Sequence, residues 1–241
     1  MQKIHVIARK EDFDAARAPG KIAVVLDIIF ATTTIITALQ HGARAVIPAG
    51  NQDQACELAA ARPDGSYVLA GEYRAETLAG FQPYNPLAMQ GLDLKGRDLI
   101  YSTTNGTVAL RAASACQRVF AGALLNASAV ARHVAQNYTE QTILLVCAGS
   151  RGMYSLEDHY GAGCFVQLLR EYAGAERVAL TDAAIAALRL FEQNDAVETL
   201  AASRIGRRMV AKSMLADVRY SAGIDTCPFV AELVDGKVVR A

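Results

Sequence analysis

The 241-residue sequence lacks any long apolar run and any excess of one charge. No stretch approaches the roughly 18 uncharged apolar residues that a membrane-spanning helix needs. Basic and acidic residues number 24 each, so the composition carries no electrostatic footprint for nucleic acid or for an anionic membrane surface. We therefore expect no nucleic-acid partner and no membrane partner, and any anionic ligand must be held by local arginines and dipoles.

Regular cysteine spacing is also missing. The five cysteines are scattered along the chain without the spacing of metal ligands. The first residues, 1–7, resemble a β-strand and lack the apolar core of a signal peptide. Reduced thiols in a cytoplasmic protein are the simplest explanation of both features.

What the chain does have is an alternation of short apolar segments with alanine-rich helical segments. The predicted strands are residues 3–7, 22–27, 45–48, 67–70, 98–101, 118–121, 142–146 and 177–180. The predicted helices are residues 33–41, 52–62, 108–115, 127–136 and 157–172, followed by an almost wholly helical stretch over 182–215 and a hairpin over 233–239. This alternation indicates parallel β–α–β units. We expect a layered α/β/α fold with a largely parallel or mixed sheet, formed by residues 1–241 as one unit or as two intimately packed subdomains.

Three predicted strands each lead into a short loop rich in hydroxyl groups or glycine, after which a helix begins. These loops are residues 31–34, 102–107 and 149–152. Such loops bring backbone N–H groups, hydroxyls and a helix N-terminus together, and anions bind there. Because they gather along the carboxyl edge of a parallel sheet, the sequence predicts one shared pocket of phosphate size.

The sequence lacks the motifs of the two common classes of phosphatase that form a covalent intermediate, on cysteine or on aspartate. The residue six positions after Cys147 is Met153, where a cysteine phosphatase needs arginine, and the core is the expected place of Cys147. The residue two positions after Asp27 is Ile29, where a phosphatase of the haloacid dehalogenase type needs aspartate. A P-loop motif is also missing. Metal-assisted attack by water remains.

Polar residues near the predicted strand ends are the candidate site residues. The candidate catalytic and metal-binding carboxylates are Asp27, Glu72 and Asp158. The candidates for holding substrate phosphate are Thr32, Thr33, Arg74, Thr103, Thr104, Asn105, Gly106, Ser150 and Arg151. Of the neighbours Glu157 and Asp158, we expect only one to face the pocket, and we favour Asp158. The alternative roles are helix capping for the acids and packing for the threonines.

In order and spacing, several segments resemble the 2-phosphosulfolactate phosphatase family (ComB-like). The matching segments include Asp27 with 31–35, Gly71-Glu72 with Arg74, residues 103–107, 126–130, 147–149, 155–158 and 182–184. The resemblance extends from about residue 3 to residue 230. It implies a magnesium-dependent phosphatase of an α/β fold that converts 2-phospho-3-sulfolactate to 3-sulfolactate, a step of coenzyme M or sulfolactate synthesis. Asp27, Glu72 and Asp158 are the candidate ligands of Mg²⁺.

The chain departs from the family pattern at Phe30, Gln82 and Ile205, where arginine, an acid and histidine are usual. Guanidinium suits oxyanions, so Phe30 removes a positive charge near the expected pocket. Either another arginine compensates, from among Arg74, Arg151 and Arg204, or the substrate is less anionic. Two alternatives follow: a phosphatase of another small phospho-acid, and a noncatalytic protein that binds a phosphorylated metabolite. An alanine-rich helical surface often packs against a partner, which makes a homodimer a further expectation.

Overall fold

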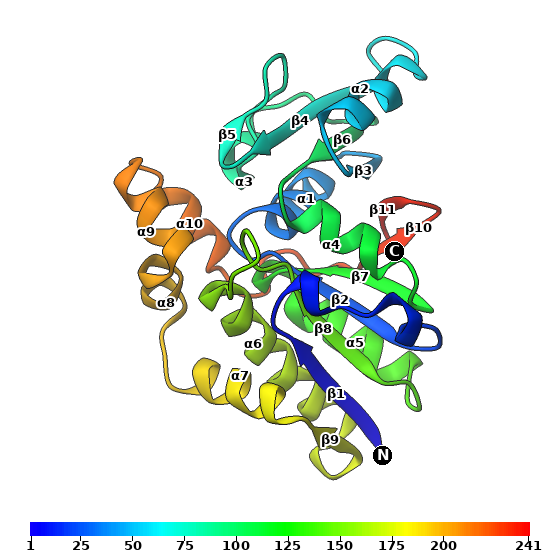
Figure 1. The fold of residues 1–241 in the computed structure, drawn as a ribbon, viewed down its shortest axis with the longest axis vertical. Coiled ribbons are helices and arrows are strands. Elements are labelled where there is room, and N and C mark those ends of the chain that lie inside the picture. The colour runs from blue at the N-terminus through cyan, green and yellow to red at the C-terminus, as the bar shows by residue number, and fades with distance from the viewer.

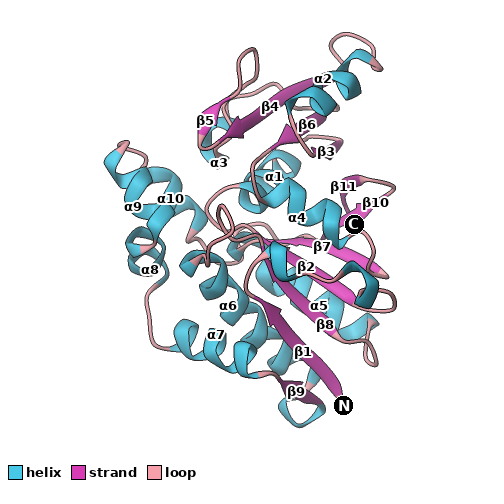
Figure 2. Cartoon of the chain, viewed as in Figure 1, coloured by secondary structure: helices cyan, strands magenta, loops and turns pink.

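The computed structural model describes all 241 residues as an α/β fold built on one 11-stranded sheet (Figures 1 and 2). The strand order is β5-β4-β6-β3-β11-β10-β7-β2-β8-β1-β9. The strands are β1 Gln2–Ile7, β2 Ile22–Leu26, β3 Ala45–Ala49, β4 Tyr67–Tyr73, β5 Glu76–Thr77, β6 Asp98–Ser102, β7 Arg118–Gly122, β8 Ile143–Cys147, β9 Val178–Leu180, β10 Ala231–Val234 and β11 Lys237–Arg240. The expected alternation of strands and helices is therefore confirmed.

The sheet consists of two parallel blocks joined by the C-terminal hairpin. One block is β4-β6-β3 and the other is β7-β2-β8-β1-β9, and Figure 1 shows them as the upper and lower parts of the sheet. The hairpin β10–β11 lies between them and is antiparallel to both neighbours, each through one residue pair, Glu232 with Phe120 and Val238 with Val46. The hairpin itself was predicted, but its place in the middle of the sheet was not.

Helices cover both faces of the sheet (Figure 2). They are α1 Ala31–Gln40, α2 Gln52–Ala60, α3 Pro86–Met89, α4 Gly106–Ala113, α5 Ala127–Asn137, α6 Leu156–Ala173, α7 Asp182–Glu192, α8 Ala196–Ala202, α9 Arg204–Ala211 and α10 Leu215–Ser221, with short 3₁₀ segments at Lys10–Asp12, Ala15–Arg17, Leu124–Asn126 and Ala175–Arg177. None of these helices is both long enough and apolar enough to cross a membrane.

Strand β2 shows why the fold is layered. Its side chains alternate between two apolar clusters: Val24 packs with residues of α5, α6 and α7, and Val25 packs with residues of α1 and α4. All five residues of the strand are buried. A strand covered on both faces has an unbroken apolar sequence, as parallel sheets require. The predicted α/β/α layering is confirmed.

Two glycines inside α6 let this helix pack closely against its neighbours. A Cβ atom at Gly161 would lie 2.5 Å from Cδ1 of Ile28, and one at Gly163 would collide with the carbonyl of Ala187 in α7. Since neither glycine has a side chain, α6 packs directly against α7 and against the loop that follows β2. This contact places the first turn of α6 beside the carboxyl ends of β2 and β8.

Candidate functional site

One pocket is formed by segments from both parallel blocks of the sheet, at the carboxyl ends of several strands. Its walls come from the segments after β2, β6 and β8, from the β4–β5 turn and from the first turns of α6 and α9. The lining residues are Asp27, Phe30, Glu72, Arg74, Ala75, Thr103, Thr104, Asn105, Gly149, Ser150, Arg151, Ser155, Glu157, Asp158, Arg204, Ile205 and Arg208. The three loops singled out in the sequence therefore belong to segments that share one pocket.

Four helices begin at this pocket. Phe30, Asn105 and Ser155 are the N-cap residues of α1, α4 and α6, and Arg204 is the first residue of α9. The N-terminus of a helix carries partial positive charge and unpaired backbone N–H groups. The pocket is consequently suited to anions, both its own carboxylates and a bound phosphate.

Asp158 holds the first turn of α6 to two loops. Its Oδ1 accepts a hydrogen bond from the backbone N–H of Ile28 at 2.9 Å, and its Oδ2 accepts one from Gly149 at 3.1 Å. Its own backbone N–H donates to Oγ of Ser155 at 3.3 Å. Burial raises the pKa of Asp158 well above its usual range, and the charges of Asp27 and Glu157 add to this shift.

Glu72 connects the β4–β5 turn with the loop after β6. Its Oε1 accepts a hydrogen bond from the backbone N–H of Thr104 at 2.6 Å, and its Oε2 accepts bonds from Ala75 N–H at 2.6 Å and from Oγ1 of Thr104 at 3.0 Å. The Arg74 N–H donates to the same Thr104 hydroxyl at 3.0 Å. Arg74 and Ala75 have φ angles of 56° and 63°, so this turn is held in the left-handed region by its bonds to Glu72 and Thr104.

Asp27 is the carboxylate of the pocket with the most consequential titration. Burial, together with the charges of Glu72 and Glu157, raises its pKa to about 7, against the opposing effects of the Ala31 amide and Lys10. A Cβ atom at Gly106 would lie 2.5 Å from Oδ2 of Asp27, so only glycine lets α4 begin beside this carboxylate. A carboxyl group that titrates near neutral pH can gain or lose a proton during a reaction.

Asn105 joins the loop after β6 to two basic residues. Its Oδ1 accepts hydrogen bonds from Nζ of Lys10 at 3.0 Å and from the backbone N–H of Arg151 at 3.3 Å. Arg151 has a φ of 56°, another left-handed residue at the rim. The sequence does not predict the contact of Lys10 with Asn105, because a lysine within the charged segment Arg9–Asp12 is typical of an exposed surface.

Two further residues of the pocket were missed or undervalued in the sequence. Glu157 is only 4% exposed, and burial raises its pKa while Ser155, Ser203 and Arg204 oppose the shift. The prediction that only one of Glu157 and Asp158 faces the pocket is wrong, since both line it. Arg204 donates from Nη2 to the Ser150 carbonyl at 3.2 Å.

The threonines of the first loop do not line the pocket. The Thr32 hydroxyl donates to the carbonyl of Asp27 at 3.0 Å, and the Thr33 hydroxyl donates to the carbonyl of Ile28 at 2.6 Å. Both side chains are fully buried. They shape the turn that presents Asp27, which is the packing role that the sequence left open.

Among the remaining candidates, Thr103 lies at the pocket while its Oγ1 accepts a hydrogen bond from the Thr107 N–H at 3.1 Å. The candidates that the structure brings to the pocket are Asp27, Glu72, Asp158, Arg74, Thr103, Thr104, Asn105, Ser150 and Arg151. Cys147 is fully buried, and burial raises the pKa of its thiol well above the usual range, with Asp158 adding to the shift. The prediction that Cys147 belongs to the core is confirmed.

The carboxylates of the pocket suit an open metal site with one or two protein ligands better than a closed site with several. The structure contains no group of three or more His, Cys, Asp or Glu side chains placed to hold one ion. Both oxygens of Glu72 and of Asp158 accept hydrogen bonds from neighbouring loops, and Glu157 interacts with Ser155 and Ser203. Asp27 has one backbone partner, the Ala31 amide, and is the carboxylate freest to bind an ion. Mg²⁺ takes oxygen ligands, keeps several waters and needs only one or two protein carboxylates. These residues fit such an open magnesium site and not a closed cage.

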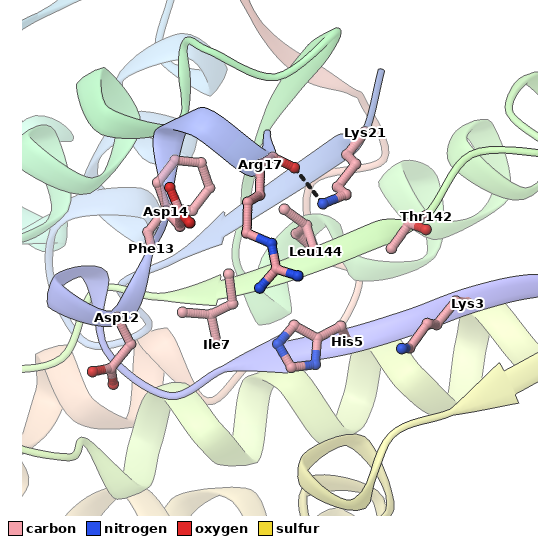
Figure 3. Close-up of a pocket in the computed structure, with 10 residues that line it drawn as sticks. All are labelled: Lys3, His5, Ile7, Asp12, Phe13, Asp14, Arg17, Lys21, Thr142 and Leu144. Atoms are coloured by element: carbon pink, nitrogen blue, oxygen red, sulfur yellow. Dashed lines mark hydrogen bonds between the residues drawn. The ribbon is translucent and has the colours of Figure 1, made fainter. Parts of the chain in front are cut away.

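A second hollow lies over the face of β1 and β8, beside the segment 12–21 (Figure 3). It is lined by Lys3, His5, Ile7, Asp12, Phe13, Asp14, Arg17, Lys21, Thr142 and Leu144. Asp12 accepts hydrogen bonds from Arg9 at 2.6 and 2.9 Å, and Asp14 accepts one from the Ala16 N–H at 3.0 Å. Because its acids are engaged and none of α1, α4, α6 and α9 begins there, this hollow lacks the chemistry of the first pocket.

Comparisons with known proteins identify the family of this chain. The family model described as 2-phosphosulpholactate phosphatase matches residues 7–236. A protein of Symbiobacterium thermophilum named "Probable 2-phosphosulfolactate phosphatase" is 36% identical over 229 residues, which cover 93% of this chain and 96% of the relative. Relatives with the same name from Prochlorococcus marinus strain MIT 9313 and Clostridium beijerinckii are 38% and 30% identical, over 91% and 98% of both chains. The chain therefore belongs to the 2-phosphosulfolactate phosphatase family, a family of phosphoric monoester hydrolases.

Proposed function

We propose that this chain is a magnesium-dependent phosphatase of a small anionic phosphomonoester. The first substrate to test is 2-phospho-3-sulfolactate, the compound in the names of the relatives, which would give 3-sulfolactate and phosphate. A place in sulfolactate or coenzyme M synthesis would follow from that substrate. The observation that carries the proposal is the convergence of four helix N-termini on one pocket with four carboxylates, Asp27, Glu72, Glu157 and Asp158.

The helix N-termini and the basic side chains of the pocket would bind the phosphate group of the substrate. The N-termini of α4 and α6 direct partial positive charge into the pocket, and Arg151 and Arg204 line it. Donors fixed in this way stabilise the charge that develops on the phosphoryl oxygens during transfer. Bound beside Asp27, Mg²⁺ would supply Lewis-acid polarisation of the phosphoryl group and of a water molecule.

The carboxylates divide into two pairs. Glu72 and Asp158 position loops through their backbone hydrogen bonds, and we assign them to the architecture of the site. Asp27 interacts with one backbone amide, that of Ala31, and Glu157 interacts with the side chains of Ser155 and Ser203, and burial raises the pKa of each carboxyl group. We propose Asp27 as the metal ligand and Glu157 as the acceptor of the proton from the attacking water, because a raised pKa makes a carboxylate a better base near neutral pH.

The test is phosphate release from 2-phospho-3-sulfolactate and from a panel of small phosphomonoesters, with Mg²⁺ and with chelator. We expect release that requires Mg²⁺ and that falls at least 100-fold in Asp27→Asn and in Glu157→Gln. Glu171→Gln is the matched control, since Glu171 lies on the exposed face of the same helix as Glu157. Equal phosphate release with Mg²⁺ and with chelator would contradict the proposed magnesium dependence. The absence of release from every ester would contradict the proposed phosphatase activity.

A second candidate substrate class is favoured by two side chains of the pocket. Phe30 and Ile205 line it at positions where the family pattern has arginine and histidine. An apolar wall binds a highly anionic substrate poorly. Another small phospho-acid with fewer charges is therefore the alternative, and the same panel of esters distinguishes the two.

A further inference from the structure

The second hollow, over β1 and β8, combines a ligand-sized volume with unpaired cations. Its volume is about 360 Å³, which is within the range of roughly 300–1,000 Å³ that is usual for sites of small ligands. It shares no lining residue with the pocket that contains the carboxylates. A ligand bound in this hollow would therefore be additional to the substrate of the proposed hydrolysis.

The polar floor of the hollow follows from the alternation of side chains along β1. Successive side chains of a strand point to opposite faces of the sheet, so Lys3, His5 and Ile7 share one face. The two residues between them are buried in the apolar cluster with residues of α5, α6 and α7. In the register of the sheet, His5 lies beside Leu144 of β8. This face of β1 therefore carries Lys3 and His5 where a face covered by helices would carry apolar residues.

Three cations from three elements line the hollow without a carboxylate partner. Lys3 lies in β1, Arg17 ends the 3₁₀ segment Ala15–Arg17, and Lys21 directly precedes β2. None of the three takes part in a salt bridge. Lys21 donates from Nζ to the Arg17 carbonyl, a neutral group that leaves its charge unbalanced. Figure 3 shows the ends of the Lys3 and Arg17 side chains directed toward the space around His5.

The two acids of the hollow do not cancel this charge. Asp12 is paired with Arg9 at 2.6 and 2.9 Å, and Arg9 does not line the hollow. Asp14 accepts a hydrogen bond from the Ala16 N–H at 3.0 Å and has no cationic partner. Three unpaired cations therefore share the hollow with one unpaired carboxylate.

His5 reports the sign of the charge at the centre of the hollow. Its Nδ1 lies 3.2 Å from Oγ1 of Thr181, and its Nε2 has no hydrogen-bond partner in the protein. Burial lowers the pKa of His5, and the charges of Lys3 and Lys21 act in the same direction, with no carboxylate opposing them. The electrostatic potential at the imidazole is therefore positive, as a site for anions requires.

We propose that this hollow is a second anion site, which binds a small polyanion with two linked phosphate or phosphonate groups between Lys3, Arg17 and Lys21. Guanidinium and ammonium groups from three elements suit a ligand with several oxyanion oxygens better than a ligand with a single carboxylate. Nε2 of His5 can add a hydrogen bond to the same ligand. Because the hollow lies apart from the carboxylates of the pocket, we assign it to binding and not to hydrolysis. The inference goes beyond the proposed function and does not depend on it.

His5 is also the reporter of the test. NMR follows the imidazole signals of the whole protein across pH, without added metal and at constant ionic strength, with methylenediphosphonate, methylphosphonate or acetate, and His5→Gln assigns the signal. Bound methylenediphosphonate should raise the pKa of His5 by roughly one pH unit and leave that of the exposed His41, which lies outside the hollow, unchanged. It should bind roughly tenfold more tightly than acetate, with methylphosphonate between them. An unchanged His5 at millimolar methylenediphosphonate, or an equal response to acetate, would overturn the inference.

Two variants and a control locate the site. Lys3→Gln and Arg17→Gln should each weaken the binding of methylenediphosphonate by about threefold, and the double variant by about tenfold. Both side chains are exposed and outside any salt bridge, so their replacement leaves the packing of the fold intact. Arg219→Gln is the matched control, because Arg219 is exposed and lines neither the hollow nor the pocket. Wild-type affinity in the double variant would contradict the assigned site.

A further variant separates the hollow from the pocket. A diphosphonate can also bind beside Arg204 in the pocket, and calorimetry alone would count both sites. In Arg204→Gln the response of His5 should persist unchanged, whereas its loss would show that the anion acts from the pocket and would overturn the inference. None of these measurements requires turnover, so a protein that hydrolyses no ester would contradict the proposed function and leave the anion site intact.

Discussion

Oδ1 of Asp158 accepts a hydrogen bond at 2.9 Å from the backbone N–H of Ile28, a residue 130 positions earlier in the chain. The second oxygen accepts from Gly149, so one carboxylate ties α6 to the loops after β2 and β8. Asp27 immediately precedes Ile28. The bond therefore sets the position of Asp27 in the pocket, and it makes Asp158 a positioning residue whose loss acts on stability and activity together.

Asp158→Asn should destabilise the fold by roughly 1–3 kcal/mol. Asparagine keeps one acceptor oxygen but turns an NH₂ group toward a backbone N–H, which leaves a buried donor without a partner. Urea unfolding at pH 7 measures the change, with Glu171→Gln as a control expected to stay within about 0.5 kcal/mol of the wild type. A wild-type unfolding midpoint for Asp158→Asn would show that the two backbone bonds contribute little.

The titration of Asp27 should make the stability of the metal-free protein fall as pH rises. The pKa of Asp27 in the folded protein is about 7, above its ordinary value of 3.8. Between these values the folded state binds the proton more tightly than the unfolded state does, so this contribution to the free energy of unfolding decreases from about pH 4 to about pH 7. In chelator at pH 8, Asp27→Asn should be more stable than the wild type by roughly 1–4 kcal/mol.

Unfolding curves at pH 5 and pH 8 test this sign. The variant should gain stability relative to the wild type only at the higher pH, because Asp27 is mostly protonated at pH 5. If the variant is as stable as the wild type at pH 8, or less stable, the ionisation of Asp27 does not cause the loss of stability at high pH.

Magnesium should offset the loss of stability that the negative charge of Asp27 causes. An ion bound at Asp27 stabilises only the folded state, by about 2.7 kcal/mol when its concentration is 100 times Kd. We expect 10 mM MgCl₂ at pH 8 to raise the Tm of the wild type and to leave the Tm of Asp27→Asn nearly unchanged. Thermal denaturation with and without chelator makes the comparison, and an equal rise in both proteins would place any bound ion elsewhere.

Gly106→Ala should impair the site through a close contact. The added methyl would lie 2.5 Å from Oδ2 of Asp27, which forces α4 and the loop after β2 apart. Overpacking of this kind costs about 1–3 kcal/mol, and we expect phosphatase activity to fall at least tenfold. Gly91→Ala is the matched control, since its nearest neighbour is the Ala88 carbonyl at 3.8 Å. Equal activity of the two variants would argue against a tight contact between Gly106 and Asp27.

The sequence predicted the elements well because their signals are local. An apolar run such as 22–26 needs no knowledge of the rest of the chain, and neither does the polar loop that follows it. The insertion of β10 and β11 between β3 and β7 carries no local signal, because it depends on which strand edges remain free after the parallel blocks form. Thr32 and Thr33 were predicted to hold phosphate for a related reason: the sequence does not distinguish a hydroxyl at a strand end that faces a ligand from one that faces a backbone carbonyl.

The expectation of a homodimer stays a prediction.

Lys10 does not line the pocket but binds Asn105 in its wall, and the sequence carries no local signal for this contact because Asn105 is 95 residues away. The positive charge of Lys10 lowers the pKa of Asp27, opposing the larger effect of burial. Lys10→Met should therefore raise the pKa of Asp27 and shift the acidic limb of the kcat/KM profile to higher pH, while Lys10→Arg should restore the wild-type limb. Lys21→Met is the control, because Lys21 lies in the other hollow. If Lys10→Met lowers kcat/KM equally at every pH, Lys10 acts through the position of Asn105 and not through the proton equilibrium of Asp27.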